Sequence, residues 1–146
     1  GKVTVVDDDV YEWASKLKWS AIYNEGNWYA LRGITVNGKQ KMERLHRRIV
    51  GAVVGQKTDH KDGDGLNNLR SNLRVCTNTE NSRNRKQSIT NTSGFKGVHF
   101  YKRHHKYHAQ ITVNRKKIHL GYFGSAPEAS CAYKIAASRY FGEFAR

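Results

Sequence analysis

The chain has 146 residues, enough for one ordinary domain or two small ones. It carries 26 lysines and arginines against 12 aspartates and glutamates, a net charge of +14, and only 38% of its residues are hydrophobic. Such an excess favours a polyanionic partner, because each Lys or Arg that neutralises a phosphate releases counterions. Nucleic acid is therefore the first candidate partner, and a merely basic surface is the alternative.

Several classes of protein are disfavoured by simple features. No apolar run reaches the roughly 18 residues that a bilayer-spanning helix needs, and we find no basic amphipathic helix suited to a membrane surface. The first nine residues include three acids, which is not typical of a signal peptide. Cys76 and Cys131 lie far apart in the sequence and form no CxxC pair. This spacing argues against a disulfide scaffold and against a Cys-rich zinc site. We expect an intracellular, cytoplasmic protein of a bacterium or a phage-infected host cell, with no membrane partner and no small-molecule cofactor.

The first third of the chain predicts a short helix followed by antiparallel strands. A helix is expected over residues 10–17. Strand-like runs follow at residues 19–23, 28–34 and 39–45. The turn at 24–27 joins the first two runs, and Asn37-Gly38 joins the last two. A second short helix is expected over residues 46–53, with Ile49, Val50 and Val53 on one side.

The middle of the chain, about residues 57–85, predicts a strand, a glycine-rich loop, a second strand and a short helix that Thr77 or Thr79 caps. Cleavage of a phosphodiester needs a group that takes a proton from water and a cation that neutralises the leaving oxygen. His60, with an ordinary pKa near 6.5, suits the first task. Asp59 is adjacent, so a twist or bulge at the strand end is required for both side chains to address one phosphate.

These residues carry a resemblance to a known family. The stretches Leu45-His46-Arg47, Asp59-His60, Asn67-Asn68, Ser71-Asn72-Leu73-Arg74 and Glu80-Asn81 resemble the HNH nucleases, over about residues 40–85. More narrowly they are similar to the phage and intron-encoded homing endonucleases, whose ββα-metal motif often ends in Asn.

The resemblance implies a role for each matching residue. His60 would be the general base, and Asn72 would hold the loop and orient His60. Asp59 and Asn81 would bind one divalent metal beside the scissile phosphate, Mg²⁺ being expected and Mn²⁺ the alternative. The final Asn, where the three-letter pattern has His, favours a hard metal over zinc.

Three further residues of this region are candidate DNA contacts, each with an ordinary alternative. His46 could contact phosphate or simply begin a helix. Arg74 and Arg83 could clamp backbone phosphates or be solvated.

The last third, residues 94–146, carries a net charge of +8 and a sharper pattern. It predicts three strands at 95–101, 107–113 and 117–123, with turns at 104–106 and 114–116. A helix follows a capping box from Ser125 to Glu128, presents mainly alanines to the sheet, and ends at Gly142 as a left-handed cap. A polar stretch before Gly94 predicts a linker.

This last part resembles the Apetala-type (ethylene-response-factor) DNA-binding domain, through Gly97-Val98, His119-Leu120-Gly121, Ala136-Ala137 and Phe141-Gly142 among other positions. In that family the sheet enters the major groove. The resemblance implies that residues on the exposed face of the sheet contact DNA, and the set expected is His99, Tyr101, Arg103, Gln110, Thr112, Lys117 and His119. Lys102, Lys106, Arg115 and Lys116 are expected to hold the DNA backbone.

Together these patterns predict an α+β protein: a ββα-metal (HNH) nuclease unit preceded by antiparallel strands, then a three-stranded antiparallel sheet packed on one helix. The domains expected are an HNH nuclease domain at 1–86, a linker at 87–93 and an Apetala-type domain at 94–146. The function expected is metal-dependent, site-specific cleavage of double-stranded DNA, of the homing type. The alternatives are an inactive DNA-binding regulator on an HNH fold and an RNA-binding or ribosome-associated protein. Monomer and dimer are both left open.

Overall fold

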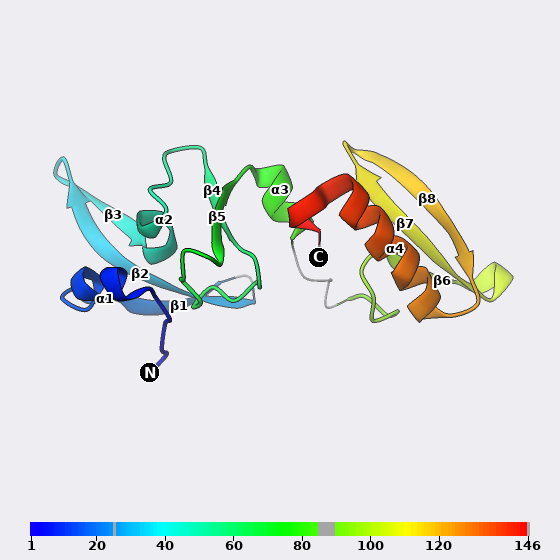
Figure 1. The fold of residues 1–146 in the computed structure, drawn as a ribbon, viewed down its shortest axis with the longest axis horizontal. Coiled ribbons are helices and arrows are strands. Elements are labelled where there is room, and N and C mark those ends of the chain that lie inside the picture. The colour runs from blue at the N-terminus through cyan, green and yellow to red at the C-terminus, as the bar shows by residue number, and fades with distance from the viewer. Residues whose placement is uncertain (25, 85–89, 146) are drawn as a thin grey trace. The chain divides into compact units, whose positions relative to one another are not determined.

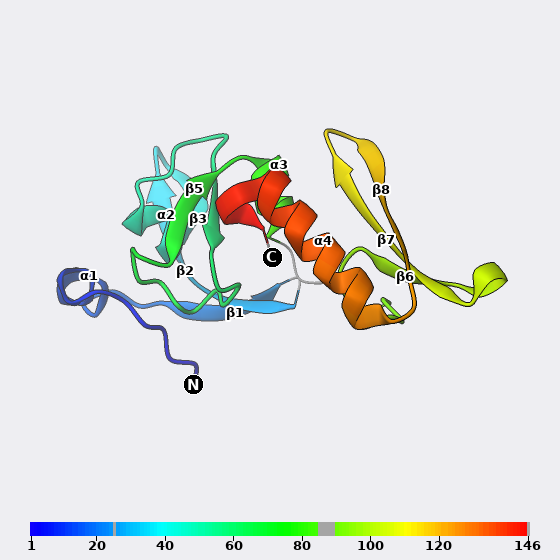
Figure 2. The ribbon, with the colours of Figure 1, turned by 45° about the vertical axis from the view of Figure 1, so that its right-hand side comes forward.

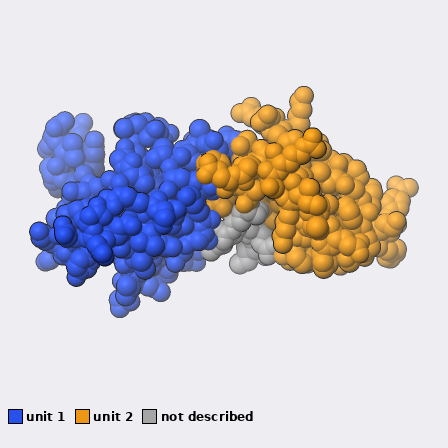
Figure 3. All heavy atoms as spheres, viewed as in Figure 1, with its two compact units in different colours: residues 1–81 blue, residues 82–146 orange. Residues whose placement is uncertain are grey.

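The structure, a computed structural model, describes residues 1–24, 26–84 and 90–145 (Figures 1 and 2). Helices and antiparallel sheets alternate along the chain, which confirms the predicted α+β class. The chain divides into two compact units, residues 1–81 and 82–146, coloured separately in Figure 3. Glu25 of the first expected turn, residue 85 of the expected ββα region and residues 87–89 of the expected linker lie outside the described residues.

The first unit begins with helix α1 (Asp8–Ala14) and a three-stranded antiparallel sheet in the order β1-β2-β3. The strands are β1 (Ser20–Asn24), β2 (Asn27–Val36) and β3 (Lys39–Arg44). Asn37 and Gly38 join the last two with φ of 51° and 72°, the left-handed pair that a tight hairpin needs. Val10, Ala14, Ala30 and Leu45 form the buried core, and Trp13 and Trp19 pack against it.

Helix α2 (Leu45–Ile49) is shorter than the sequence predicts. Gly51 has a φ of 62°, a backbone conformation that interrupts the helix. Ile49 packs against the core as expected. Val53 is 61% exposed, so the expectation that it shares the buried side with Ile49 was wrong.

The middle of the chain forms a two-stranded antiparallel sheet, β4 (Lys57–His60) with β5 (Leu73–Cys76), followed by α3 (Asn78–Arg83). Thr77 and Glu80 form a reciprocal capping box at the start of α3. The Thr77 hydroxyl accepts from the Glu80 amide (3.2 Å), and the Glu80 carboxylate accepts from the Thr77 amide (2.8 Å). The order strand, loop, strand, helix agrees with the element order that the sequence predicts.

The second unit contains a three-stranded antiparallel sheet in the order β6-β7-β8 with helix α4 across one face (Figure 2). Its elements are β6 (Val98–Tyr101), the 3₁₀ turn η1 (Lys102–His104), β7 (Lys106–Val113), β8 (Lys116–Phe123), α4 (Ala126–Phe141) and the 3₁₀ turn η2 (Gly142–Phe144). Ser125 caps α4 by accepting from the Glu128 amide. Ala129, Ala136 and Ala137 are buried, so the small side chains let the helix lie close to the sheet.

Two details of this unit differ from the sequence prediction. Strand β6 begins only at Val98, because Gly97 has a φ of 71°, a conformation outside the strand region. Gly142 has a positive φ (53°) but a ψ of −126°, so it is not a left-handed helical cap, and the chain continues into η2. No helix among the described residues is long and apolar enough to cross a membrane.

Candidate active site

Asp59 lies on β4 directly opposite Arg74 on β5, and the two side chains form a buried ion pair. The Nε and Nη2 atoms of Arg74 both donate to Asp59 Oδ2, at 2.8 and 2.6 Å. The two side chains are only 7% and 9% exposed, so the pair fixes the carboxylate in a defined position. Arg74, expected as a DNA contact, is thus placed beside Asp59. The β4–β5 pairing is regular and has no bulge, so the bulge considered for the strand end is not found.

His60 ends β4 and is 5% exposed. Its Nε2 atom lies 3.1 Å from Asn68 Oδ1. The network behind Asn68 fixes the protonation of this ring: the Thr4 hydroxyl donates to the Leu66 carbonyl (2.7 Å) and accepts from Asn68 Nδ2 (2.7 Å). Asn68 Oδ1 must therefore be an acceptor, and His60 Nε2 carries the proton. The lone pair of the neutral ring is then on Nδ1.

The surroundings of His60 keep it neutral. Burial lowers the pKa of His60 below its usual value, while the Asn68 hydrogen bond and the nearby carboxylates of Asp62 and Asp59 act in the opposite direction. A neutral imidazole with a fixed tautomer is the form that can accept a proton from water.

Asn72 holds the loop between the two strands. Its side chain donates to Asp62 Oδ1 (3.0 Å) and to the Asn67 carbonyl (2.8 Å) and accepts from the Asp62 amide (3.1 Å). The loop-holding role expected for Asn72 fits these contacts. His60 itself donates a hydrogen bond to Asn68 Oδ1, and orientation of His60 by Asn72 stays a prediction. The sequence pattern placed Asn67-Asn68 among the HNH-like residues but predicted no separate role for Asn68.

His46, at the start of α2, lies next to the base candidate. It is 6% exposed, and its ring centroid is 5.0 Å from that of His60 and 5.6 Å from that of Tyr29. Burial, followed by electrostatic interactions with His60, Arg44 and Arg47, lowers the pKa of His46 to about 3. The structure therefore places His46 as a neutral, buried neighbour of His60 rather than on the surface.

Of the two expected metal ligands, Asp59 lies on β4 and Asn81 lies in α3, where its backbone amide donates to the Thr77 carbonyl (3.0 Å). Burial, followed by the Asp59 and Glu80 carboxylates, raises the pKa of the nearby Cys76 thiol to about 11. Cys76 is thus a neutral thiol at neutral pH. The oxygen donors of Asp59 and Asn81 fit Mg²⁺, which is commonly held by one or two protein side chains together with waters and phosphate. Over the described parts of the chain no three His, Cys, Asp or Glu side chains are grouped as a metal site.

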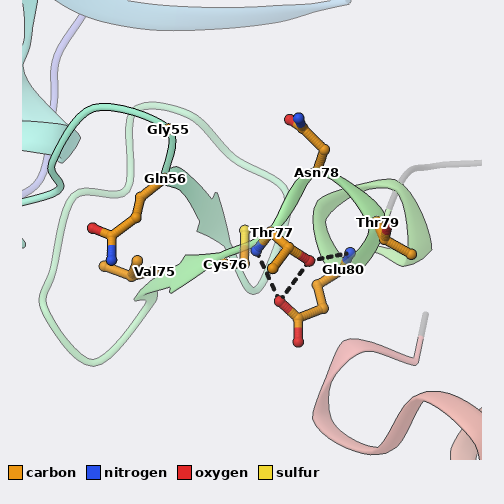
Figure 4. Close-up of a pocket in the computed structure, with 8 residues that line it drawn as sticks. All are labelled: Gly55, Gln56, Val75, Cys76, Thr77, Asn78, Thr79 and Glu80. Atoms are coloured by element: carbon orange, nitrogen blue, oxygen red, sulfur yellow. Dashed lines mark hydrogen bonds between the residues drawn. The ribbon is translucent and has the colours of Figure 1, made fainter.

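An open hollow of about 490 Å³ lies beside the start of α3 (Figure 4). Its lining, Gly55, Gln56, Val75, Cys76, Thr77, Asn78, Thr79 and Glu80, includes the capping box but neither Asp59 nor His60. The hollow is therefore adjacent to the candidate site and is not the site itself.

In the second unit, most of the expected DNA contacts lie on the sheet face opposite α4. His99, Tyr101, Thr112, Lys117 and His119 are exposed strand residues, and Gln110 is half-buried between them. Arg103 was expected on a strand, but it lies in the turn η1. Two residues of this face were missed, His108 and Tyr122, which are cross-strand partners. The alternation of β7 and β8 was their signal, but a register shift at Ala109/Gln110 changes which residues of β8 face outward.

Arg83, the remaining expected contact, has its guanidinium over the ring of Phe141, 4.8 Å from the ring centroid. Its cationic head is thereby stacked on an aromatic face within the second unit.

Comparison with known proteins identifies the class to which this fold and site belong. An uncharacterized HNH endonuclease of Acanthamoeba polyphaga mimivirus is 30% identical over 135 residues, which span 88% of this chain and 69% of the viral protein. The chain belongs to the HNH endonuclease family. Protein 3.8 of Escherichia phage T7 is 38% identical over 63 residues, 43% of this chain, and the match spans about half (52%) of the phage protein. Neither a known family profile nor a solved structure matches the chain.

Proposed function

We propose that this chain is a metal-dependent, site-specific DNA endonuclease of the homing type, which hydrolyses phosphodiester bonds with His60 as general base. The observation that carries the proposal is the buried, neutral His60, whose proton is held on Nε2 by Asn68, one residue along β4 from the fixed carboxylate of Asp59. Membership of the HNH endonuclease family supports the same chemistry.

The proposed reaction uses the lone pair of His60. Nδ1 accepts a proton from a water molecule, the water oxygen forms a bond to phosphorus, and the bond from phosphorus to the 3′ oxygen breaks. Asp59 and Asn81 would hold one divalent ion, Mg²⁺ or Mn²⁺, which would neutralise charge on the phosphate and the leaving oxygen. Arg74 keeps the Asp59 carboxylate in place, and Asn72 keeps the loop folded.

The second unit is proposed to supply affinity and choice of site. A three-stranded antiparallel sheet with one helix on its back is the arrangement that the Apetala-type resemblance implies, and the net charge of +8 in residues 94–146 suits a phosphate backbone. On this proposal residues 1–86 form the nuclease domain and 94–146 the DNA-binding domain, and Gln110, Thr112 and Lys117 face the DNA.

The experiment that tests the proposed function is incubation of the whole chain with supercoiled plasmid in Mg²⁺, in Mn²⁺ and in EDTA. Nicked or linear plasmid is expected with either metal and not with EDTA. A metal-loaded Asp59→Asn variant should bind the plasmid but cut it more slowly. Tight DNA binding without cleavage in either metal would contradict the proposal and favour an inactive, DNA-binding regulator.

A further inference from the structure

The second unit carries a continuous row of aromatic rings that the proposed nuclease chemistry does not use. We call the five residues the aromatic row: His104, Tyr101, Tyr122, His108 and His119. Successive ring centroids along it are 5.2, 5.6, 5.2 and 4.7 Å apart, and the last two rings are stacked. Four successive contacts across η1, β6, β8 and β7 are more than isolated surface aromatics provide.

The row lies on the outer face of the sheet. The inner face holds the core, where Val98, Ala109 and Ile111 are buried against α4. Tyr101 and Tyr122 point the other way and are 39% and 46% exposed, although each is a large apolar ring. The strand register explains how the row assembles. His108 lies on the central strand directly opposite Tyr122 of β8. On its other side it lies opposite His99 of β6, and Tyr101 is two residues further along that strand.

The charge around the row favours an anionic partner. Residues 94–146 contain ten lysines and arginines and only two acids, Glu128 and Glu143, which lie on α4 and η2 rather than on the sheet. Lys106 is the cross-strand neighbour of Tyr101, and Lys117 and Thr112 extend the same face beyond His119. Exposed aromatic rings bordered by cations fit a strand of nucleic acid better than an apolar protein surface.

The rings also indicate which form of nucleic acid fits. Within a duplex the flat faces of the bases are covered by their neighbours, so aromatic side chains can stack only on bases that are unpaired or unstacked. We propose that the aromatic row is a binding site for unpaired bases of single-stranded DNA, with the surrounding lysines on the phosphates. The proposal rests on the proposed function only for the choice of DNA over RNA.

Binding of the whole chain to a labelled thymidine oligonucleotide and to a duplex of the same length, both in EDTA, tests this site without cleavage. Replacing both exposed tyrosines, Tyr101→Ala with Tyr122→Ala, should weaken single-strand binding roughly tenfold or more, and duplex binding by much less. Tyr122→Phe keeps a ring and should bind like the wild type. Tyr140→Ala removes an equally exposed tyrosine (42%) from α4 and should also have no effect.

A second readout locates the contact directly. Irradiation of a bound oligonucleotide that contains 5-iododeoxyuridine is expected to cross-link to residues of the aromatic row. The proposal would be overturned if the double variant lost duplex and single-strand binding equally, or lost neither. It would also be overturned by cross-links outside the aromatic row, or by tighter binding of the matching uridine oligoribonucleotide. Because the assay contains no metal, these outcomes are independent of whether the chain cuts DNA.

Discussion

At the scale of single residues, the site is built from polar groups that are buried and paired. Asp59 is neutralised by Arg74, His60 is held by Asn68, and Asn72 hydrogen-bonds Asp62 and Asn67 of the loop. A buried polar group without its partner is costly, so each of these positions should be sensitive to substitution in a way that surface charges are not.

His46 should make the first unit sensitive to acid. Its pKa in the folded chain, about 3, lies below the 6.5 of an unfolded histidine, so the unfolded state takes up the proton first as the pH falls. The stability that depends on neutral His46 is complete above pH 6.5 and is lost between pH 6.5 and about 3. At about pH 4.5 the loss amounts to about 2 to 3 kcal/mol.

Urea unfolding measured by tryptophan fluorescence at about pH 7.5 and 4.5 checks this, because all three tryptophans lie in the first unit. His46→Gln should reduce the fall in unfolding free energy between the two pH values. His99→Gln, at an exposed position in the second unit, should leave it unchanged. Equal behaviour of the two variants would show that His46 titrates normally.

Arg74→Leu should destabilise the first unit by about 3 to 5 kcal/mol, because it leaves the Asp59 carboxylate buried without its cation. The matched control is Arg70→Leu, which removes the exposed pair with Asp9 and should have a much smaller effect. Both are measured by urea unfolding followed by tryptophan fluorescence. Similar losses for the two variants would contradict the special position of Arg74.

At the scale of elements, periodicity and turn residues predicted the order of the strands and helices, although the bounds of α1, α2 and β6 differ from the prediction. Asn37-Gly38 predicted the β2–β3 turn, and the capping box predicted the start of α4. What could not be predicted depends on distant contacts. Asn68 reaches Thr4, 64 residues away, and the pairing of Asp59 with Arg74 depends on the strand register. The outward position of Tyr122 depends on a local register shift that leaves no mark in the hydrophobic pattern.

Substitution of Gly97 tests the packing of the sheet against α4, because the missing side chain allows the two to approach closely. A Cβ at this position would collide with the Tyr133 ring and lie 2.7 Å from the Gln110 carbonyl, in addition to the strain of a φ of 71°. Gly97→Ala should therefore raise hydrogen exchange throughout residues 98–141, with tryptophan fluorescence of the first unit unchanged. Gly94→Ala has a similar φ of 75° but open space around its Cβ, so it should have only the milder effect of strain. Equal exchange in the two variants would contradict the close packing.

At the scale of the whole molecule, we propose that the first unit cuts DNA and that the second unit binds it. The net charge of +8 in residues 94–146 makes up more than half of the total of +14. Affinity should therefore depend strongly on salt, and more on the sheet side of the second unit than on the exposed side of its helix.

Lys116→Gln with Lys117→Gln should weaken duplex binding and lower the slope of log affinity against log salt by up to about 1.8, which corresponds to two lost phosphate contacts. The matched control carries Lys134→Gln and Arg139→Gln on α4 and has the same net charge. Fluorescence anisotropy over a salt series measures both slopes. A control that loses as much as the test pair would show that charge acts only globally.

The central claim is that His60 activates the water that cuts DNA. Single-turnover cleavage of plasmid by the wild type and by His60→Ala, in Mg²⁺ and at saturating protein, tests it most directly. The account predicts a rate at least about 100-fold lower for the variant, with DNA affinity and tryptophan fluorescence unchanged. A variant that folds, binds and cuts at the wild-type rate would contradict the assignment of His60 as the base.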